Sequence, residues 1–431
     1  MNEKIIQVKE NAFIHVMKTE KFKTNFIASF VLVDLNREEI TKNALIPAVL
    51  KRGTTKMPTM KVISDAMDDL YGAIFDASSD KLGNKQALQF YISCIDDAYA
   101  LNGEKVLSDS VNFINDLMFH PQLNNGVFHK EYVEQEKIQL LELIKSRIND
   151  KASYALCRAI EELYPVDPYG VYKYGREEDI FTINEINLYE QYQKVMREGE
   201  YHIYLVGRIQ EEMVQKVSHL IETEIEELQK NQSINTIYSH RVSVDKTDLN
   251  KITTVKHVKD TGEVIQGKIV LAYDAKIDPF SDDLYKVFVY NAILGSSATS
   301  KLFQNVREKK SMAYTIRSMY LKHKALMLIT AGIEMDKYEK ALTYIKAEVE
   351  DMRKGNFTEE DIQNAKVFLE NVYKTYTDDE VNMVNMSMGH FLLGMTFDID
   401  EMIEKVKAVN KQDIIDIANN MEPKLEYYLG N

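Results

Sequence analysis

The pattern of hydrophobic and polar residues predicts the same order of strands and helices twice along the chain. Each time, a run of apolar residues typical of a buried strand precedes two stretches with the spacing of amphipathic helices, and a strand-like stretch follows them. The first copy predicts strand, helix, helix and strand at residues 26–35, 43–50, 59–69 and 70–77. The second copy predicts the same elements at residues 268–273, 282–294, 300–308 and 312–318. The offset of roughly 240 residues makes each copy a domain rather than a short solenoid repeat.

The ends of the two copies agree as well. After residues 182–184 the pattern predicts a helix to about residue 196 and then a strand at 201–207. After residues 409–411 it predicts a helix to about residue 421 and then a strand at 425–430. Each of these strands ends on a glycine. We therefore predict an α+β fold of two homologous domains, each a largely antiparallel sheet packed with helices.

Polar composition places the boundary between the copies. Residues 228–248 are rich in Asn, Gln, Ser, Thr and Lys and show no sustained helical or alternating pattern, as expected of an exposed connector. The predicted domains are then residues 1–227 and 249–431. A chain of 431 residues also exceeds what one hydrophobic core usually supports, which agrees with this division.

Composition and charge narrow the functional classes. A formal net charge of −14 argues against a nucleic-acid binder, which needs clustered Lys and Arg to neutralise phosphates. No stretch approaches the roughly 18–20 apolar residues of a membrane helix, and the first residues contain no long apolar run for secretion. We therefore expect no membrane insertion and a cytoplasmic location. Cys94 and Cys157 lie in apolar segments without a nearby second Cys or His, which predicts buried thiols rather than metal ligands.

Two segments of the chain carry motifs of a known type. Residues 43–54 read NALIPAVLKRGT, and residues 295–314 read GSSATSKLFQNVREKKSMAY. The first resembles the zinc-motif helix of the pitrilysin/insulinase-like, or inverzincin, peptidase family, which ends in a Lys-Gly-Thr turn. The second resembles the C-terminal signature of that family. Together with the order of elements, the resemblance covers nearly the whole chain and implies the family's short, half-clamshell form.

The zinc motif of that family is H-x-x-E-H, in which two histidines one helical turn apart bind the metal and the glutamate activates water. Aligned on Gly53 and Thr54, these positions fall on Ala44, Pro47 and Ala48. Neither a methyl group nor a proline ring offers a lone pair for zinc or for a proton. The chain therefore lacks both nitrogen ligands and the general base.

The remaining zinc ligand of the family is a glutamate on a later helix, seven residues after a supporting glutamate. The resemblance retains the supporting residue as Glu136 and places Leu143 at the ligand position. Glu142 lies one position early, and because one residue turns a helix by about 100°, it should not substitute directly. The nine histidines include no pair at the i, i+4 spacing of one helix face. We expect no metal and no cofactor in this chain.

In active members of the family an arginine and a tyrosine, seven residues apart, reach the substrate at the zinc site. The resemblance places them at Arg307 and Tyr314, where a guanidinium can hold a carbonyl or carboxylate and a phenol can donate to an oxyanion. Alternatively, Arg307 caps or salt-bridges its own helix and Tyr314 is a half-buried strand residue. The preceding loop, with Gly295, Ser296 and Ser297, would contact the substrate or a partner.

The resemblance implies a non-catalytic subunit of a heterodimeric zinc endopeptidase. The partner would be a homologue with an intact H-x-x-E-H site and its zinc, whereas this chain would close the chamber around short or leader-type peptides and supply Arg307 and Tyr314 in trans. A structural or scaffolding pseudo-peptidase with no role in proteolysis is the alternative from another class. A stand-alone hydrolase with a relocated metal site is a third reading, because ligands distant in sequence can still meet.

Overall fold

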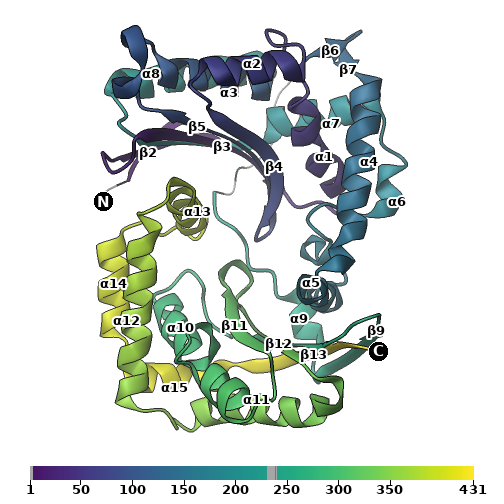
Figure 1. Cartoon of the computed structure of the whole chain (residues 1–431), viewed down its shortest axis with the longest axis vertical. Helices are drawn as coiled ribbons and strands as arrows, with labels where there is room; N and C mark the ends of the chain where they lie inside the picture. Colours follow the sequence, from purple (N-terminus) through teal and green to yellow (C-terminus); the bar gives the residue numbers. More distant parts are fainter. Residues whose placement is uncertain (1–2, 231–237, 239) are drawn as a thin grey trace. The chain divides into compact units, whose positions relative to one another are not determined.

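A computed structural model describes residues 3–230, 238 and 240–431, and the contacts within it divide the chain into two compact units (Figure 1). Unit 1 contains Met1–Lys145, Val171–Val242 and Glu380–Leu392. Unit 2 contains Ser146–Gly170, Ser243–Asp379 and Leu393–Asn431. Each unit therefore takes segments from both halves of the sequence.

The predicted domains are continuous stretches of sequence, whereas the two units are defined by contacts and are each assembled from several segments. The domains at 1–227 and 249–431 stay a prediction. Of the connector predicted at 228–248, residues 231–237 and 239 lie outside the described residues.

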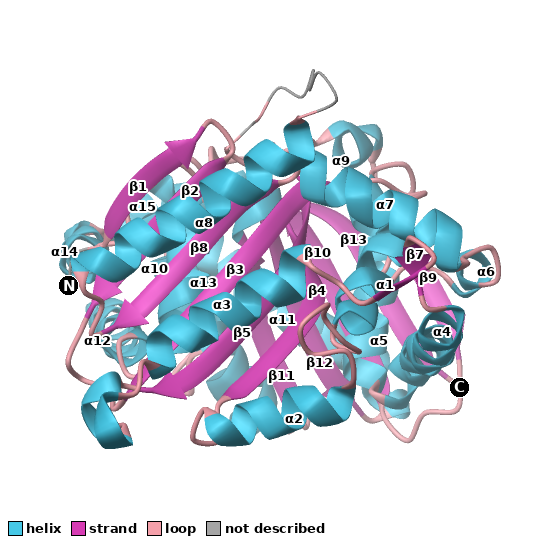
Figure 2. Ribbon diagram, turned by 90° about the horizontal axis from the view of Figure 1, so that it is seen from above, coloured by secondary structure: helices cyan, strands magenta, loops and turns pink. Residues whose placement is uncertain are grey.

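Within the described residues, unit 1 is built on a six-stranded sheet with the order β1-β2-β8-β3-β5-β4. Its strands are β1 (Lys4–Lys9), β2 (Ala12–Lys18), β3 (Thr24–Asp34), β4 (Ile74–Leu82), β5 (Lys85–Ile95) and β8 (Glu200–Gly207). Strands β2 and β8 run parallel, and the other neighbours are antiparallel. Helices α3 (Val106–Phe119) and α8 (Glu211–Gln229) lie across one face of this sheet (Figure 2).

The other helices of unit 1 complete its core. They are α1 (Ile40–Leu50), α2 (Met60–Asp69), α4 (Lys130–Ser146), α6 (Glu177–Ile180), α7 (Glu185–Glu198) and α13 (Glu380–Phe391). A short hairpin pairs β6 (Leu123–Asn124) with β7 (Val127–Phe128). Buried side chains such as Leu45, Phe90, Leu117 and Leu205 join the sheet to the helices. Helix α13 contacts β3 from the face opposite α3 and α8 (Figure 1).

In the part of the chain that the structure describes, unit 2 has a five-stranded sheet with the order β11-β12-β10-β13-β9. Its strands are β9 (Lys256–Thr261), β10 (Gly267–Asp274), β11 (Thr315–Leu321), β12 (Leu326–Ile333) and β13 (Glu422–Gly430). Its helices are α5 (Lys151–Leu163), α9 (Thr247–Lys251), α10 (Asp283–Asn291), α11 (Tyr338–Arg353), α12 (Glu359–Tyr376), α14 (Ile399–Ala408) and α15 (Lys411–Asn420). Helix α5 covers one face of this sheet, where Ala155, Ala159 and Leu163 pack with Val270 and Tyr427. Two π-helical segments, Ala292–Ser296 and Leu302–Lys309, pack on β11.

The two sheets repeat one topology. The order β4-β5-β3-β8-β2 in unit 1 matches β11-β12-β10-β13-β9 in unit 2, and β1 is an additional strand at the edge of the first sheet. In both units the first three pairings along this order are antiparallel and the last is parallel. This shared pattern confirms the predicted α+β fold with two homologous sheets packed with helices.

Local departures from the predicted elements occur at turns. The strand predicted from residue 70 begins only at Ile74, because Tyr71 and Gly72 form a turn with φ of 61° and 72°. The helix predicted over 282–294 loses its α-helical pattern after Asn291 and continues as the π-helical segment to Ser296. Among the described helices, none is long and apolar enough to cross a membrane.

The predicted burial of the two thiols is confirmed for one of them. Cys94 is buried, and this burial raises the pKa of its thiol to about 11. Cys157 is only half-buried on α5, so the prediction was wrong for this residue. The reason is its place on the helix, one position after Leu156, which is also half-buried, and two positions before the fully buried Ala159.

Candidate functional site

Helix α1 contains the three positions that match the zinc motif. Ala44 and Pro47 are buried and Ala48 is half-buried, while the fourth position, Leu143 on α4, is 44% exposed. Methyl groups, a proline ring and an isobutyl group offer no ligand atom, so these residues do not fit zinc. In the described ranges, no group of three His, Cys, Asp or Glu side chains is arranged to hold a metal ion.

A neutral amide network holds α1 beside these positions. Asn43 Nδ2 donates to Gln86 Oε1 at 3.0 Å, and Gln86 Nε2 donates to Ile40 O at 3.0 Å and to Ser79 Oγ at 3.1 Å. Gln191 Nε2 on α7 donates to Asn43 Oδ1 at 2.8 Å. These buried groups satisfy one another across α1, β4, β5 and α7. These hydrogen bonds, with a further one from Gln191 Nε2 to Glu39 Oε2 at 3.0 Å, fix the buried side of this helix.

The retained glutamate on α4 has a different partner. Arg52, in the turn after α1, donates through Nε to Glu136 Oε1 at 2.6 Å, and its guanidinium lies 5.8 Å from the Tyr132 ring centre. Both charged side chains are largely buried, at 21% and 14% exposure, which strengthens the pair relative to a surface contact. Glu136 thus joins α4 to the end of α1 through Arg52.

Buried histidines from two strands meet on the α13 side of the unit 1 sheet. The parallel register pairs His15 on β2 with Tyr204 on β8, two positions after His202. His15 Nδ1 lies 2.7 Å from Glu3 Oε1, and His202 Nε2 lies 2.7 Å from Glu200 Oε1. The other ring nitrogens, His15 Nε2 and His202 Nδ1, face each other at 3.0 Å. A search for histidine pairs at i, i+4 spacing could not find this contact, because His15 and His202 are 187 residues apart in the sequence.

The two histidines and their carboxylates form one buried hydrogen-bond network. Each ring lies within hydrogen-bond distance of a carboxylate on one side and of the other ring on the other side, so Glu3, His15, His202 and Glu200 are linked in a row. Burial lowers the pKa of His202 to about 4, which keeps the His202 ring neutral at neutral pH. Helix α13 covers these hydrogen-bonded side chains, and its Ser387 Oγ donates to Glu3 Oε1 at 2.6 Å.

Acidification is expected to destabilise unit 1 through His202. Because its pKa falls from 6.5 to about 4 on folding, stability is full above pH 6.5 and is lost as the pH falls towards 4, by about 3 kcal/mol. The lowered pKa of Glu200 acts in the same direction at still lower pH, and His240 Nδ1 lies 3.1 Å from that carboxylate. The midpoints of urea unfolding are measured from pH 7 to 4 for wild type and His202→Gln, and the midpoint should fall less steeply with pH in the variant. Identical pH slopes for the two proteins would contradict it.

Arg307 and Tyr314 lie in unit 2, before and after the turn that leads into β11. Arg307 is half-buried in the π-helical segment, with its guanidinium 4.5 Å from the Phe303 ring centre and Nε 3.6 Å from Glu308 Oε1. Tyr314 is 50% exposed and its hydroxyl donates to Glu334 Oε1 at 2.9 Å, which raises the pKa of the phenol. No hydrogen bond joins Arg307 to Tyr314 among the described residues. Each side chain is accessible, and their use stays a prediction.

The segment predicted to contact substrate or partner packs inward. Gly295 is buried, and a methyl group there would lie 2.6 Å from Ser318 Oγ, so only glycine permits this approach to β11. Ser297 is also buried and donates to Ala292 O at 3.1 Å, whereas Ser296 is half-buried. Among these three residues, Ser296 has the side chain best placed for an external contact.

Comparison with a family model and with curated proteins identifies relatives of this chain. Residues 182–368 match the model described as Peptidase M16 inactive domain. "Probable inactive metalloprotease YmfF" of Bacillus subtilis is 29% identical over 96% of this chain and 95% of that protein. "Uncharacterized zinc protease YmxG" of the same organism is 21% identical over 74% of each chain.

Solved structures share the fold over the whole chain. A conserved protein from Enterococcus faecalis matches with a TM-score of 0.85 and 24% identity, over 100% of this chain and 99% of that one. The peptidase M16 inactive domain from Pseudomonas fluorescens matches with a TM-score of 0.78 and 14% identity, over 100% and 98%. The fold described above is therefore found in solved chains of similar length.

Proposed function

We propose, starting from the fact that this chain belongs to the M16 peptidase family, that it is the non-catalytic subunit of a heterodimeric zinc endopeptidase. The sequence prediction of the family is confirmed, and the chain is a homologue of a protein named as an inactive metalloprotease. A catalytic partner with an intact H-x-x-E-H site would hold the zinc. This chain would close the chamber and contribute substrate contacts.

The observation that supports this proposal is that no side chain able to bind zinc stands at the four positions that match the family's zinc site, although the fold of the chain is present. Ala44, Pro47, Ala48 and Leu143 cannot bind the metal, and the buried amide network beside them needs no ion. Both sheets and their helices are nevertheless present. A domain that is kept intact after losing its own chemistry fits a role beside a competent subunit.

Substrate and location belong to the same proposal. An enclosed chamber favours short or leader-type peptides over folded proteins, and a net charge of −14 favours basic segments through long-range attraction. We place the pair in the cytoplasm, where a partner and its peptides would be encountered together.

Reconstitution tests the proposal. The purified chain is mixed with a zinc-bearing M16 homologue from the same genome, and cleavage of a quenched fluorescent peptide library is followed for each protein alone and for the mixture. We expect activity to rise at least about tenfold on mixing, because substrate contacts are completed only in the pair. A complex that forms on size-exclusion chromatography without any stimulation would contradict the proposal.

A scaffolding pseudo-peptidase with no role in proteolysis is the second candidate. It is favoured by the contacts of the two signature residues within their own chain, since Tyr314 donates to Glu334 and Arg307 stacks on Phe303. Under this reading, removing either functional group leaves the activity of every partner unchanged. The same reconstitution therefore distinguishes the two candidates.

A further inference from the structure

A cavity of about 280 Å³ lies on the α5 face of the unit 2 sheet. Strand register decides which side chains line it, because residues paired across neighbouring strands point to the same face. Two adjacent rows of paired residues across β10, β12 and β11 line the cavity. The first row is Lys268, Gly332 and Thr315, and the second is Val270, Thr330 and Arg317. The first turns of α5 close the cavity from above the sheet.

Two cations in this cavity have no carboxylate bound to them. Arg317 is exposed on β11 and, within the described residues, forms no ion pair or hydrogen bond. Lys268 Nζ donates to the neutral Gln266 Oε1 at 3.1 Å, and burial lowers the pKa of Lys268. Asp150 is the carboxylate that acts on Lys268 through charge, but its two oxygens accept from the Ser153 N–H at 3.1 Å and the Ser153 hydroxyl at 2.6 Å. An anion entering the cavity would find both cations available.

Polar and apolar groups occupy different parts of the lining. A methyl group on Gly332 would lie 2.8 Å from Thr315 Oγ1 and 3.1 Å from Lys268 Nζ, so the missing side chain leaves the space where these two polar groups converge. Val270 on the sheet and Leu156 on α5 supply apolar surface. The volume is near the lower limit of ligand pockets, about 300 Å³, which suits a single small residue.

We propose that this cavity binds the C-terminal carboxylate of a peptide whose last residue is small and apolar. Arg317 and Lys268 bind the carboxylate, with Thr315 and Thr330 as further donors, and the side chain packs on Val270 and Leu156. A peptide can reach the site because β11 pairs only with β12 among the described strands and so presents a sheet edge. The choice of a peptide as ligand rests on the proposed function, and the site itself extends it.

Direct binding to the purified full-length chain tests the site. A fluorescein-labelled decapeptide of alternating Gly and Ser, ending in Ala-Val, is titrated by fluorescence anisotropy in two forms, with a free C-terminal carboxylate and as the C-terminal amide. We expect the amide to bind at least about tenfold more weakly, because the charge-assisted hydrogen bonds are lost. Arg317→Ala and Lys268→Met should each weaken binding of the peptide with the free C-terminal carboxylate by a similar factor. Lys354→Ala, which removes a side chain 60% exposed elsewhere in unit 2, is the matched control and should change nothing.

Each other outcome overturns an identified part of the proposal. Equal affinity of acid and amide, or wild-type affinity in Arg317→Ala, excludes carboxylate recognition here. Acetyl-valine competing as well as the decapeptide assigns the site to free acyl amino acids instead of peptides. If the peptide binds through its carboxylate but the chain does not stimulate the M16 homologue, the cavity is a peptide site and the proposed peptidase role is wrong. If the chain stimulates the homologue but the peptide does not bind, the proposed function holds and the proposed site is wrong.

Discussion

In the reconstituted pair, Arg307→Ala is expected to lower kcat/KM by about 100-fold or more while the complex still assembles. A guanidinium that holds a substrate carbonyl or stabilises developing negative charge contributes on this scale in other enzymes. Arg307 is half-buried and rests on Phe303, and its ion pair with Glu308, at 3.6 Å between Nε and Oε1, is exposed to solvent and therefore weak. Its fork is therefore free to turn toward a substrate at little cost.

Matched variants separate this role from a structural one. Tyr314→Phe removes only the hydroxyl that donates to Glu334 and should lower kcat more than it raises KM, because an oxyanion forms only in the transition state. Lys309→Ala removes an exposed cation from the same segment as Arg307 and should leave kcat/KM unchanged. Wild-type turnover in Arg307→Ala and Tyr314→Phe would favour the scaffolding function instead.

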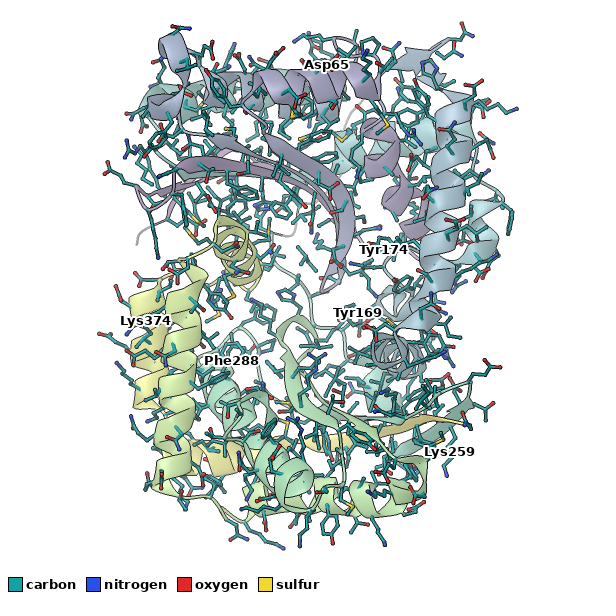
Figure 3. All side chains as sticks on the ribbon, viewed as in Figure 1. Asp65, Tyr169, Tyr174, Lys259, Phe288 and Lys374 are labelled. Atoms are coloured by element: carbon teal, nitrogen blue, oxygen red, sulfur yellow. The ribbon has the colours of Figure 1, made fainter. Side chains whose placement is uncertain are left out.

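Asp167→Ala is expected to destabilise unit 2 by about 3–5 kcal/mol, because it leaves a buried ammonium without its counter-ion. Lys324 is 1% exposed and donates to Asp167 Oδ2 at 2.5 Å. Its ammonium also lies 5.0 Å from the Tyr164 ring centre and 4.7 Å from that of Tyr169, which Figure 3 labels. These contacts hold the segment after α5 in unit 2, so the loss also loosens α5 above the proposed peptide site.

Circular dichroism during urea unfolding measures this effect, since the chain has no tryptophan. The double variant Asp167→Ala, Lys324→Met should recover part of the loss, because methionine fills the space of the lysine stem without a charge. Glu370→Ala is the matched control, because both of its partners, Lys374 and Lys407, are exposed, at 60% and 57%, and it should cost at most about 1 kcal/mol. Equal midpoints for Asp167→Ala and wild type would show that the buried pair contributes no stability.

Strand and helix periodicity was sufficient to predict the duplicated sheets. The apolar run before α1 forms β3, and its counterpart in the second copy forms β10, which occupies the equivalent position in the second sheet. Local signals also mark helix ends: Thr358 precedes α12, and its hydroxyl accepts from the Asp361 N–H in a capping box. Signals of this kind are local, so a single sequence contains them.

Features that depend on pairing between distant segments could not be predicted in the same way. The His15 and His202 contact exists only because β2 and β8 run parallel in one register, and the sequence fixes neither partner nor register directly. A histidine within an otherwise apolar strand was the available signal. Likewise, helix α13 belongs to unit 1 although it follows most of unit 2 in the chain. The lining of the proposed peptide site depends on three strands and α5 together.

The prediction that this chain lacks a zinc site depends only on side-chain chemistry at positions aligned with the family motif. The resemblance placed Ala44, Pro47 and Ala48 where two ligands and a base are needed, and these residues lie on one helix as expected. The hydrogen-bond network beside these positions, centred on Asn43, Gln86 and Gln191, could not be foreseen. These three residues lie on α1, β5 and α7, which are separated by long stretches of sequence.

Zinc content of the isolated chain tests the central claim most directly. The purified protein is incubated with excess zinc, dialysed against zinc-free buffer and analysed by mass spectrometry for metal per chain. Without imidazole or carboxylate at Ala44, Ala48 and Leu143, we predict that no stoichiometric zinc is retained. One zinc ion per chain that survives dialysis and accompanies peptide cleavage by this chain alone would contradict the account.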